Sequence, residues 1–317
     1  MDGNGSNLSS FTQNQEAVFT DCEDAFCIFT FVLFFLTIAL IMVLNSVCLL
    51  VLRHVRGIKE TTKLFMMSLT LSDLCAGIFL GIPYIYYFIF TSWIVSGSFC
   101  KISPYLITAL ITINASSIVL LTTDRFLAIA YPLHYPRLMT LTRSKVMVTL
   151  VWSLTIILYS ALYCLPSSQS EIVKEKHAIL CAWHHLFLFV IPSIAGVSLG
   201  TILILYAHIL KVARRQARLI AAQNILGNIE GRQNIPGPIS TKSATTVIII
   251  TGTACLCWIP GIINALLASE DFKVSASFYI TAITLYCSNC WLNCIIYYWR
   301  NREFKQALHN LRSPCCH

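Results

Sequence analysis

The sequence predicts an all-α membrane protein: a seven-transmembrane helix bundle with a short amphipathic C-terminal helix. Two observations predict this fold class. Hydrophobic residues make up 56% of the 317 residues and charged residues only 11%, whereas soluble domains carry about 25% charged residues. The apolar residues also stand in long blocks, and about 20 apolar residues without charge can cross the hydrocarbon core as a helix.

Seven of these apolar blocks are long enough to span a bilayer. Asp73 is the only ionisable acid within their interiors, and no Lys or Arg interrupts them. A soluble chain of this length would interrupt such blocks with charged helix faces. In order along the chain, the predicted spans cover residues 27–52, 64–90, 102–123, 146–166, 186–210, 243–269 and 274–299.

The basic residues predict the orientation of these spans. Of 22 Lys and Arg residues, only Lys101, Lys174, Lys176 and Lys273 lie on the side of the N-terminus, which leaves 18 on the other side. Cytoplasmic loops hold the excess of Lys and Arg. We therefore expect a multi-pass plasma-membrane protein with its N-terminus outside and its C-terminus inside. The net charge of +8 reflects this topology and predicts no nucleic-acid binding, because the basic residues are spread over all the inner loops.

Residues on the outer side fit an extracellular environment. Asn4-Gly5-Ser6 and Asn7-Leu8-Ser9 match the acceptor pattern for N-glycosylation. Disulfides persist outside the cell, and spacing alone allows three pairings of four cysteines. The four outer cysteines are Cys22, Cys27, Cys100 and Cys181.

One polar set lies inside the predicted spans, where ionisable side chains are costly and mark functional sites. Asp73 belongs to the second span, and asparagines of three other spans are available to face it. Several oxygen atoms around one carboxylate suit a small hard cation such as sodium or a proton relay. A hydrogen-bonded cluster that only holds helices together is an equal alternative. The asparagines are Asn45, Asn114, Asn289 and Asn293.

Asp124-Arg125-Phe126 stands at the cytoplasmic end of the third span. Adjacent opposite charges there fit either a conformational switch or two residues that snorkel to the membrane surface. The neighbouring sequence favours the switch, since each span carries one landmark in a fixed order. The landmarks are Asn45, Asp73, Trp93 seven residues before Cys100, Asp124-Arg125-Phe126 followed by Tyr131-Pro132-Leu133, Trp152, Pro192, Cys257-Trp258-Ile259-Pro260, Asn293-Cys294-Ile295-Ile296-Tyr297 and Asn301-Arg302-Glu303-Phe304.

On these residues the chain resembles the rhodopsin-like (class A) G protein-coupled receptors from about residue 40 to 312, with no subfamily assigned. The resemblance implies a ligand-activated receptor without enzymatic activity, whose partner is a heterotrimeric G protein. Arg125 would pair with Asp124, its only evident resting partner, and its release beside Phe126 would open a cavity for the Gα C-terminal helix. Leu133 would pack into a groove on Gα, and Tyr297 would swing inward to support the active state.

The resemblance also implies an allosteric sodium site and a disulfide. Asp73, Asn114, Asn289 and Asn293 would hold the sodium ion, and no other cofactor is expected. The disulfide would join two outer cysteines and hold the second outer loop over the ligand pocket. These cysteines are Cys100 and Cys181.

The C-terminal part of the chain resembles that of the same family. Residues 301–312 would form an amphipathic helix on the lipids of the inner leaflet, and Cys315 and Cys316 just beyond it are candidates for palmitoylation. The chain then divides into an extracellular segment (1–26), a seven-transmembrane receptor domain (27–299) and a cytoplasmic helix and tail (300–317).

Several residues depart from the family pattern around the switch. Gly200 stands where most members have the Tyr that contacts the released Arg, and Tyr206 lies six residues further on. Cys294 replaces the usual Pro of span seven. Residues 240–246 contain no acid that could hold Arg125. We therefore expect a loosely held resting state and elevated basal activity.

The predicted ligand pocket is mostly apolar. Ile107 stands where amine receptors of the family have an Asp, and a buried ammonium needs such a counter-ion. Cys287 stands where opsins have the Lys of the retinal Schiff base. We therefore expect a neutral, lipid-like or peptide ligand and neither a monoamine nor retinal. The pocket residues are Ile107, Thr108, Ile111, Thr112, Trp258, Ile262, Ala265, Ile283 and Tyr286.

Two alternatives to a G protein-activating receptor stay open. A seven-span transporter or channel would need a polar route across the membrane, whereas Asp73 is the only interior charge. A receptor-like protein that no longer couples is compatible with the departures in spans five and seven.

Overall fold

The computed structural model describes residues 25–81, 97–165, 171–174, 179–182, 185–229, 240–269 and 276–312. The predicted glycosylation residues Asn4 and Asn7, and the predicted palmitoylation residues Cys315 and Cys316, lie outside this part of the chain. The side chains of Cys100, Cys181 and Ala265 lie outside it as well, although their backbone belongs to described elements.

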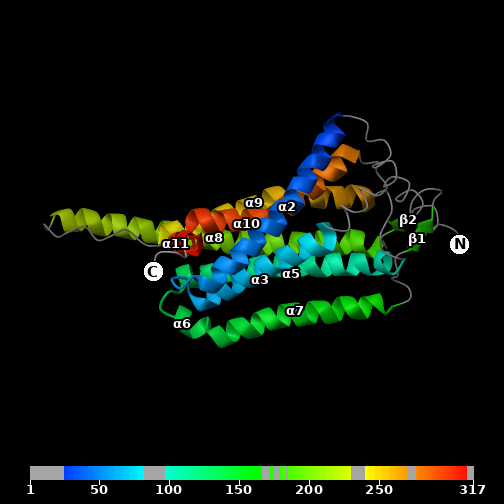
Figure 1. Cartoon of the computed structure of the whole chain (residues 1–317). Coiled ribbons are helices and arrows are strands. Elements are labelled where there is room, and N and C mark those ends of the chain that lie inside the picture. The colour runs from blue at the N-terminus through cyan, green and yellow to red at the C-terminus, as the bar shows by residue number, and fades with distance from the viewer. Residues whose placement is uncertain are drawn as a thin grey trace.

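Within the described residues, seven long helices pack into one bundle, which confirms the predicted all-α fold class (Figure 1). A short two-stranded sheet lies at one end of the bundle, and α6 and α11 lie at the opposite end, called the inner end below. The helices are α2 (Ala25–His54), α3 (Glu60–Ala76) with its π-helical continuation η1 (Gly77–Gly81), α5 (Gly97–Ala130), α6 (Tyr135–Leu138), α7 (Leu141–Tyr163), α8 (His185–Ile229), α9 (Ser240–Ser269), α10 (Ala276–Arg300) and α11 (Arg302–Arg312).

The helices extend beyond the predicted spans, most of all at the inner end. The third span was predicted at 102–123, whereas α5 covers Gly97–Ala130; the fifth was predicted at 186–210, whereas α8 continues to Ile229. The apolar run marks only the part of a helix that lies in hydrocarbon. Helical hydrogen bonding continues past that boundary wherever the polar sequence allows it.

A β-hairpin follows α7 and adds a small sheet to the predicted helical fold. Strand β1 (Glu171–Lys174) pairs antiparallel with β2 (Ile179–Ala182), and Ile172 stands opposite Cys181. The hairpin lies at the end of the bundle opposite α6 (Figure 1).

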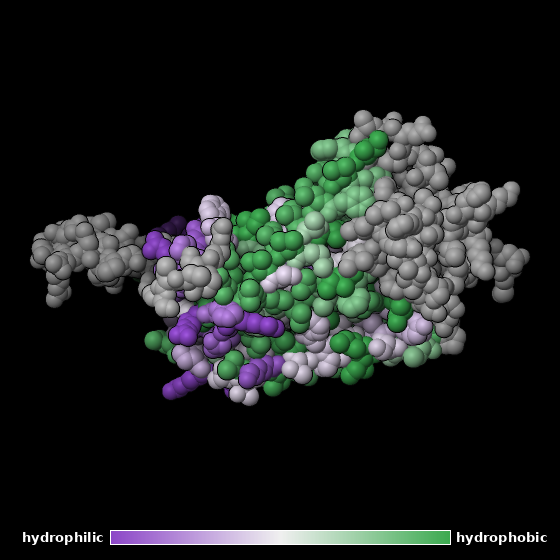
Figure 2. Space-filling view, in the orientation of Figure 1, coloured by the Kyte–Doolittle hydropathy of each residue, from purple (hydrophilic) through white to green (hydrophobic). Residues whose placement is uncertain are grey.

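The exposed surface of the bundle is apolar along the middle of the helices and polar at the inner end. Figure 2 shows hydrophobic residues along the helices and hydrophilic residues gathered near α6 and α11. Large apolar side chains such as Ile157, Val197 and Leu256 are exposed, as expected where lipid replaces water. Five described helices hold a stretch long and apolar enough to span a membrane, and α9 holds a shorter one over Gly252–Asn264.

Two glycines bring α2 close to α3. Gly77 and Gly81 are four residues apart, and a Cβ atom on either would meet α2 side chains: Ile41 at Gly77 and Ile38 at Gly81. Small residues at this spacing let membrane helices approach closely and gain dispersion contacts where no hydrophobic effect acts between them.

A hydrogen-bonded trio joins α3, α5 and α7. The indole Nε1 of Trp152 donates to Ser68 Oγ at 3.0 Å, and Ser68 Oγ lies 3.0 Å from Ser117 Oγ. Because no water is available at this depth, each polar group must find a protein partner. The trio therefore fixes α7, the most lipid-exposed of the spans, against its neighbours.

The C-terminal helix α11 is amphipathic, as predicted. Asn301 caps it, since its Oδ1 accepts hydrogen bonds from the backbone N–H groups of Glu303 (3.0 Å) and Phe304 (3.3 Å). Phe304 is buried in the main apolar cluster, and Leu308 packs against that cluster. The apolar face of α11 is therefore attached to the inner end of the bundle.

Candidate functional site

The predicted switch residues lie at the inner end of α5 and form an ion pair. Asp124 is fully buried, and the Arg125 side chain is 27% exposed. Arg125 donates to Asp124 Oδ2 through Nη2 at 2.5 Å and through Nε at 3.1 Å. Removing one member of a buried pair leaves an uncompensated charge and costs about 3–5 kcal/mol. The pair is thus a strong local constraint on this end of α5.

Thr62, near the start of α3, joins both members of the pair. Its hydroxyl donates to Asp124 Oδ2 at 2.8 Å, and Arg125 Nη2 donates to the same Thr62 oxygen. Thr62 is thus a second partner of Arg125, beside the single one expected from the sequence. Thr62 therefore connects the ion pair of α5 to the first turn of α3.

Tyr135 in α6 hydrogen-bonds the other carboxylate oxygen of Asp124. Its hydroxyl donates to Asp124 Oδ1 at 2.6 Å, so the Thr61 hydroxyl, 3.2 Å away, donates to the Tyr135 oxygen. The ammonium group of Lys59 lies 4.1 Å from the centre of the Tyr135 ring, within reach of a cation–π interaction. Burial of the ring, and then its bond to Asp124, raise the pKa of Tyr135 above its ordinary value, so the phenol stays a donor.

Local sequence explains how α6 presents Tyr135. Pro136 stands in the first turn of the helix, where its missing N–H leaves no helical bond unmade. Arg143 Nη1 closes the other end by donating to the backbone oxygens of Arg137 (2.9 Å) and Leu138 (3.2 Å). The end of the single turn α6 is therefore attached to α7 through Arg143.

Leu133, the predicted Gα contact, lies two residues before Tyr135 and is 89% exposed. The described residues cover little of this side chain, so it is available to a partner. The same short segment thus carries an exposed apolar side chain and a buried bond to Asp124.

Phe126 lies on the other side of α5, against α8. It packs beside Tyr206 on a small cluster whose buried members are Ile129 and Ile209. Gly200 of α8 takes no part in this cluster. A Cβ atom at Gly200 would point into open space, since it would meet nothing within 4 Å. Tyr206 thus lies next to the third switch residue.

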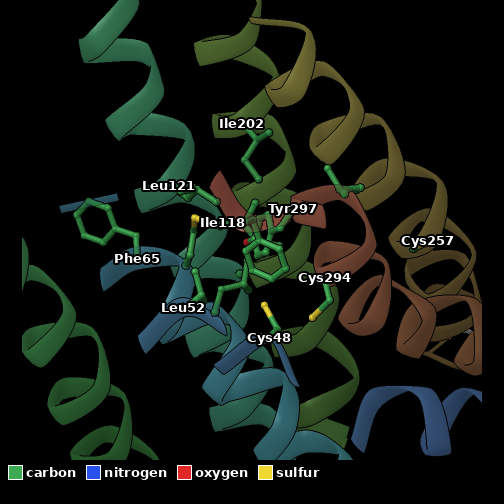
Figure 3. Packing of buried hydrophobic residues seen from close by; sticks show 14 of the residues in the cluster. Cys48, Leu52, Phe65, Ile118, Leu121, Ile202, Cys257, Cys294 and Tyr297 are labelled. Carbon is green, nitrogen blue, oxygen red and sulfur yellow. The ribbon is translucent and has the colours of Figure 1, made fainter. Parts of the chain in front are cut away.

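Tyr297 of α10 is buried in the main apolar cluster together with Cys48 and Cys294 (Figure 3). Its hydroxyl has no hydrogen-bond partner among the described residues. A buried unsatisfied hydroxyl costs about 1–3 kcal/mol. A hydrogen-bond partner for the Tyr297 hydroxyl would therefore stabilise this part of α10.

Asp73 gathers most of the predicted polar set. Asn114 Nδ2 donates to its Oδ1, and Asn293 Nδ2 donates to its Oδ2 at 3.3 Å. Asn45 lies apart from Asp73: it donates to the backbone oxygen of Cys290 at 3.3 Å and accepts from the Cys294 thiol at 3.2 Å. The structure thus brings together three of the predicted groups and places Asn45 in a helix-joining role.

The residues around Asp73 fit a small hard cation. Asn289 Oδ1 and Asn293 Oδ1 are buried oxygen atoms without a hydrogen-bond partner among the described residues. One carboxylate and several amide oxygens are ligands that such ions prefer. Within the described chain, no group of three or more His, Cys, Asp or Glu residues could hold a metal ion.

The predicted ligand residues come from three helices at the outer half of the bundle. Ile107 and Thr108 of α5 are buried, and Trp258 of α9 lies beneath Tyr286 of α10, with 6.2 Å between their ring centroids. Thr112 Oγ1 lies 3.1 Å from the hydroxyl of Tyr159 on α7. Ile111, Ile262 and Ile283 are partly buried. Sequence reasoning missed Tyr159, which extends this region to α7.

These features define the class: a helical membrane protein with a buried charge pair at its inner face and polar groups in its core. The profile of the 7 transmembrane receptor (rhodopsin family) matches residues 44–297, most of the chain. The chain therefore belongs to this family of signalling receptors, which are not enzymes.

Similar proteins are receptors as well. Mouse G-protein coupled receptor 52 is 24% identical, with 81% of this chain and 73% of the relative aligned. Human G-protein coupled receptor 12 is 28% identical over 83% of this chain and 75% of the relative. The histamine H2 receptor of Cavia porcellus is 26% identical over 94% of this chain and 84% of the relative. Such a protein is a multi-pass membrane receptor.

Proposed function

We propose that this receptor binds an extracellular ligand and activates a heterotrimeric G protein through Asp124, Arg125 and Phe126. The observation that carries the proposal is the closed inner face, where Asp124 receives donors from Arg125, Thr62 and Tyr135. Release of Arg125 from this set would free a cation and open space at the inner end. Leu133 and Tyr297 would then contact Gα and support the open state, respectively.

The proposed orientation has the N-terminus outside and α6 and α11 in the cytoplasm. The excess of Lys and Arg on the latter side supports it. The outer half of the bundle then faces the ligand, and a disulfide between Cys100 and Cys181 would hold β2 near the outer end of α5. Glycosylation at Asn4 and Asn7 and palmitoylation at Cys315 and Cys316 belong to the same proposal.

The proposed ligand is neutral, lipid-like or an apolar peptide end. One relative is a histamine receptor, but this chain has buried Ile107 where an amine would need a counter-ion. The hydroxyls near the pocket belong to Thr108, Thr112 and Tyr159, which suit a hydrogen-bonding neutral group.

A sodium ion at Asp73 is proposed as an allosteric ligand of the resting state. Asp73 would supply the negative charge, and Asn114, Asn289 and Asn293 the amide groups around it. The unpaired oxygens of Asn289 and Asn293 support this assignment. Sodium chloride is expected to raise the melting temperature of the purified receptor more than choline chloride does, and to lose this effect in Asp73→Asn.

The test of coupling is nucleotide exchange with the receptor in nanodiscs. Each Gα class is incubated with the receptor, first without ligand and then with a ligand library, and GTPγS binding is measured. We expect exchange with at least one Gα class, and no exchange with Arg125→Ala at an equal concentration of folded receptor. Equal exchange by Arg125→Ala would overturn the switch assignment.

The same purified protein, placed in liposomes as well as in nanodiscs, tests the two alternative functions. A transporter or channel would show ion flux in liposomes and no exchange on any Gα. A receptor-like protein that does not couple would bind ligands from the library and show neither activity. Either result would replace the proposed function.

A further inference from the structure

The cysteine at position 294 attaches α10 to α2 through a side chain. Its thiol donates to Asn45 Oδ1 at 3.2 Å, and Asn45 Nδ2 donates to the backbone oxygen of Cys290 at 3.3 Å. Cys290 and Cys294 stand four residues apart, which is about one turn of a helix. Asn45 therefore holds α10 at two successive turns, once through the backbone and once through the thiol.

This attachment lies inside the bundle, where its polar groups have few other partners. Asn45 is fully covered and Cys294 is 6% exposed. Asn45 Nδ2 also donates to the backbone oxygen of Ile41 in its own helix at 2.9 Å, which fixes the amide so that Oδ1 faces the thiol. A thiol is a weak donor, but a bond lost at this depth is not replaced by a bond to water.

Cysteine at this position also leaves α10 without the bend that proline would introduce. In an α-helix the N–H of residue 294 points to the carbonyl of residue 290, and proline removes that hydrogen bond and kinks the helix. α10 contains no proline over Ala276–Arg300, whereas α8 and α9 carry Pro192 and Pro260 in their interiors. A sharp bend in a helix needs a cause such as proline. The inner end of α10 therefore moves together with the turn that carries Cys294.

Tyr297 lies on this inner end of α10. It follows Cys294 by three residues, so the two side chains share one face of the helix, and both belong to the main apolar cluster (Figure 3). The Tyr297 hydroxyl is buried without a hydrogen-bond partner among the described residues. A displacement of α10 that gives this hydroxyl a partner also displaces Cys294 and breaks the bond between its thiol and Asn45.

We propose that Cys294 is a positioning residue that keeps α10, and with it Tyr297, in the resting arrangement through its thiol bond to Asn45. Proline, the usual residue of the family at this position, has no side-chain donor and cannot make this bond. The bond therefore opposes activation in this chain in a way that the family pattern does not provide. The inference rests on the proposed function for its effect on nucleotide exchange, whereas the attachment of α10 to α2 does not depend on coupling.

The test compares three variants of the full-length receptor in nanodiscs. Cys294→Ala removes the thiol donor and leaves a good helix former in α10, while Cys294→Ser keeps a donor at the same position. Cys48→Ala is the matched control, because Cys48 lies in the same buried cluster but its thiol lies 3.6 Å from Thr70 Oγ1 of α3. Melting temperatures verify that each variant is folded.

The first measurement is ligand-free GTPγS binding on a coupled Gα, at equal concentrations of folded receptor. A hydrogen bond of ordinary net strength shifts a two-state equilibrium by about two- to tenfold, so Cys294→Ala should raise basal exchange by this factor. Cys294→Ser and Cys48→Ala should stay close to the unmodified receptor. A lower melting temperature of Cys294→Ala without a rise in exchange would reduce Cys294 to a packing role, and an equal rise in Cys48→Ala would assign the effect to the cluster; either result overturns the proposal.

The second measurement does not depend on coupling to a G protein. Hydrogen exchange of the backbone amides over residues 294–300 is followed by mass spectrometry in the same variants, because it reports local opening of this part of α10. Cys294→Ala should exchange faster there, while Cys294→Ser and Cys48→Ala should match the unmodified receptor. If no Gα class responds, the proposed function fails and this measurement still decides the inference; unchanged amide exchange in Cys294→Ala would then refute it.

Discussion

Replacing Tyr135 by Phe removes one oxygen atom from the set of groups that holds Asp124. The ring remains buried, and Lys59 keeps its position over it. Asp124 Oδ1 loses its donor at 2.6 Å, and Thr61 loses its acceptor. The variant therefore isolates the bond between α6 and the charge pair with little change in packing.

The size of the effect follows from the charge on the acceptor. A hydrogen bond to a charged group contributes about 1.5–3 kcal/mol, and each 1.4 kcal/mol is about a tenfold change in an equilibrium constant. We expect α6 to leave Asp124 when the inner face opens, so only the resting state loses this energy. If resting molecules outnumber active ones by about a hundredfold, the active fraction rises to between about 10% and 60%.

The assay is ligand-free GTPγS binding on a coupled Gα, normalised to surface receptor. Tyr131→Phe is the matched control, because Tyr131 is exposed and contacts the Phe126 ring edge-on at 6.0 Å through its own ring. Tyr135→Phe should raise basal exchange by about tenfold or more above the unmodified receptor, and Tyr131→Phe should not. The same basal exchange in the two variants would refute the role of the bond.

Three further changes test other parts of the structure. Asp124→Asn should raise basal exchange, because Arg125 keeps only its bond to Thr62; unchanged basal output would contradict the resting role of the ion pair. Gly77→Leu should lower the melting temperature of the purified receptor, since a Cβ atom would lie 2.7 Å from Ile41 and overpacking costs about 1–3 kcal/mol. Gly196→Leu is its control, because a Cβ there meets nothing within 4 Å, and equal melting of the two variants would disprove close packing at Gly77. Cys181→Ala should reduce surface expression or ligand affinity; normal behaviour of that variant would argue against the outer-loop disulfide.

The fold and the place of the switch were predictable from the sequence because both depend on local pattern. Apolar blocks mark the spans, and Arg125 beside Asp124 is visible as a dipeptide. The inner ends of α5 and α8 were not predictable from the same pattern, since apolar runs stop at the membrane while the helices continue to Ala130 and Ile229.

The partners of the switch were less accessible to sequence reasoning. Thr62 and Tyr135 lie 62 and 11 residues from Asp124 in the chain, and neither residue type is unusual at its position. Only the packing of the single turn α6 against the start of α3 brings them to Asp124. The four-residue spacing of Gly77 and Gly81 indicates a close contact between helices. The sequence does not tell which helix makes this contact, and only the structure shows that it is α2, through Ile38 and Ile41.

Three segments of the chain, α3, α5 and α6, meet at the carboxylate of Asp124, and this convergence has an evolutionary consequence. A lineage that replaced Tyr135 would leave a buried anion short of a donor, so selection would favour a compensating change at Asp124, Thr61 or Thr62. These positions should therefore drift as a unit when related genes are compared, while Leu133, two residues from Tyr135, remains free to follow the choice of signalling partner. Divergence in coupling could then proceed without disturbing the hydrogen bonds around Asp124.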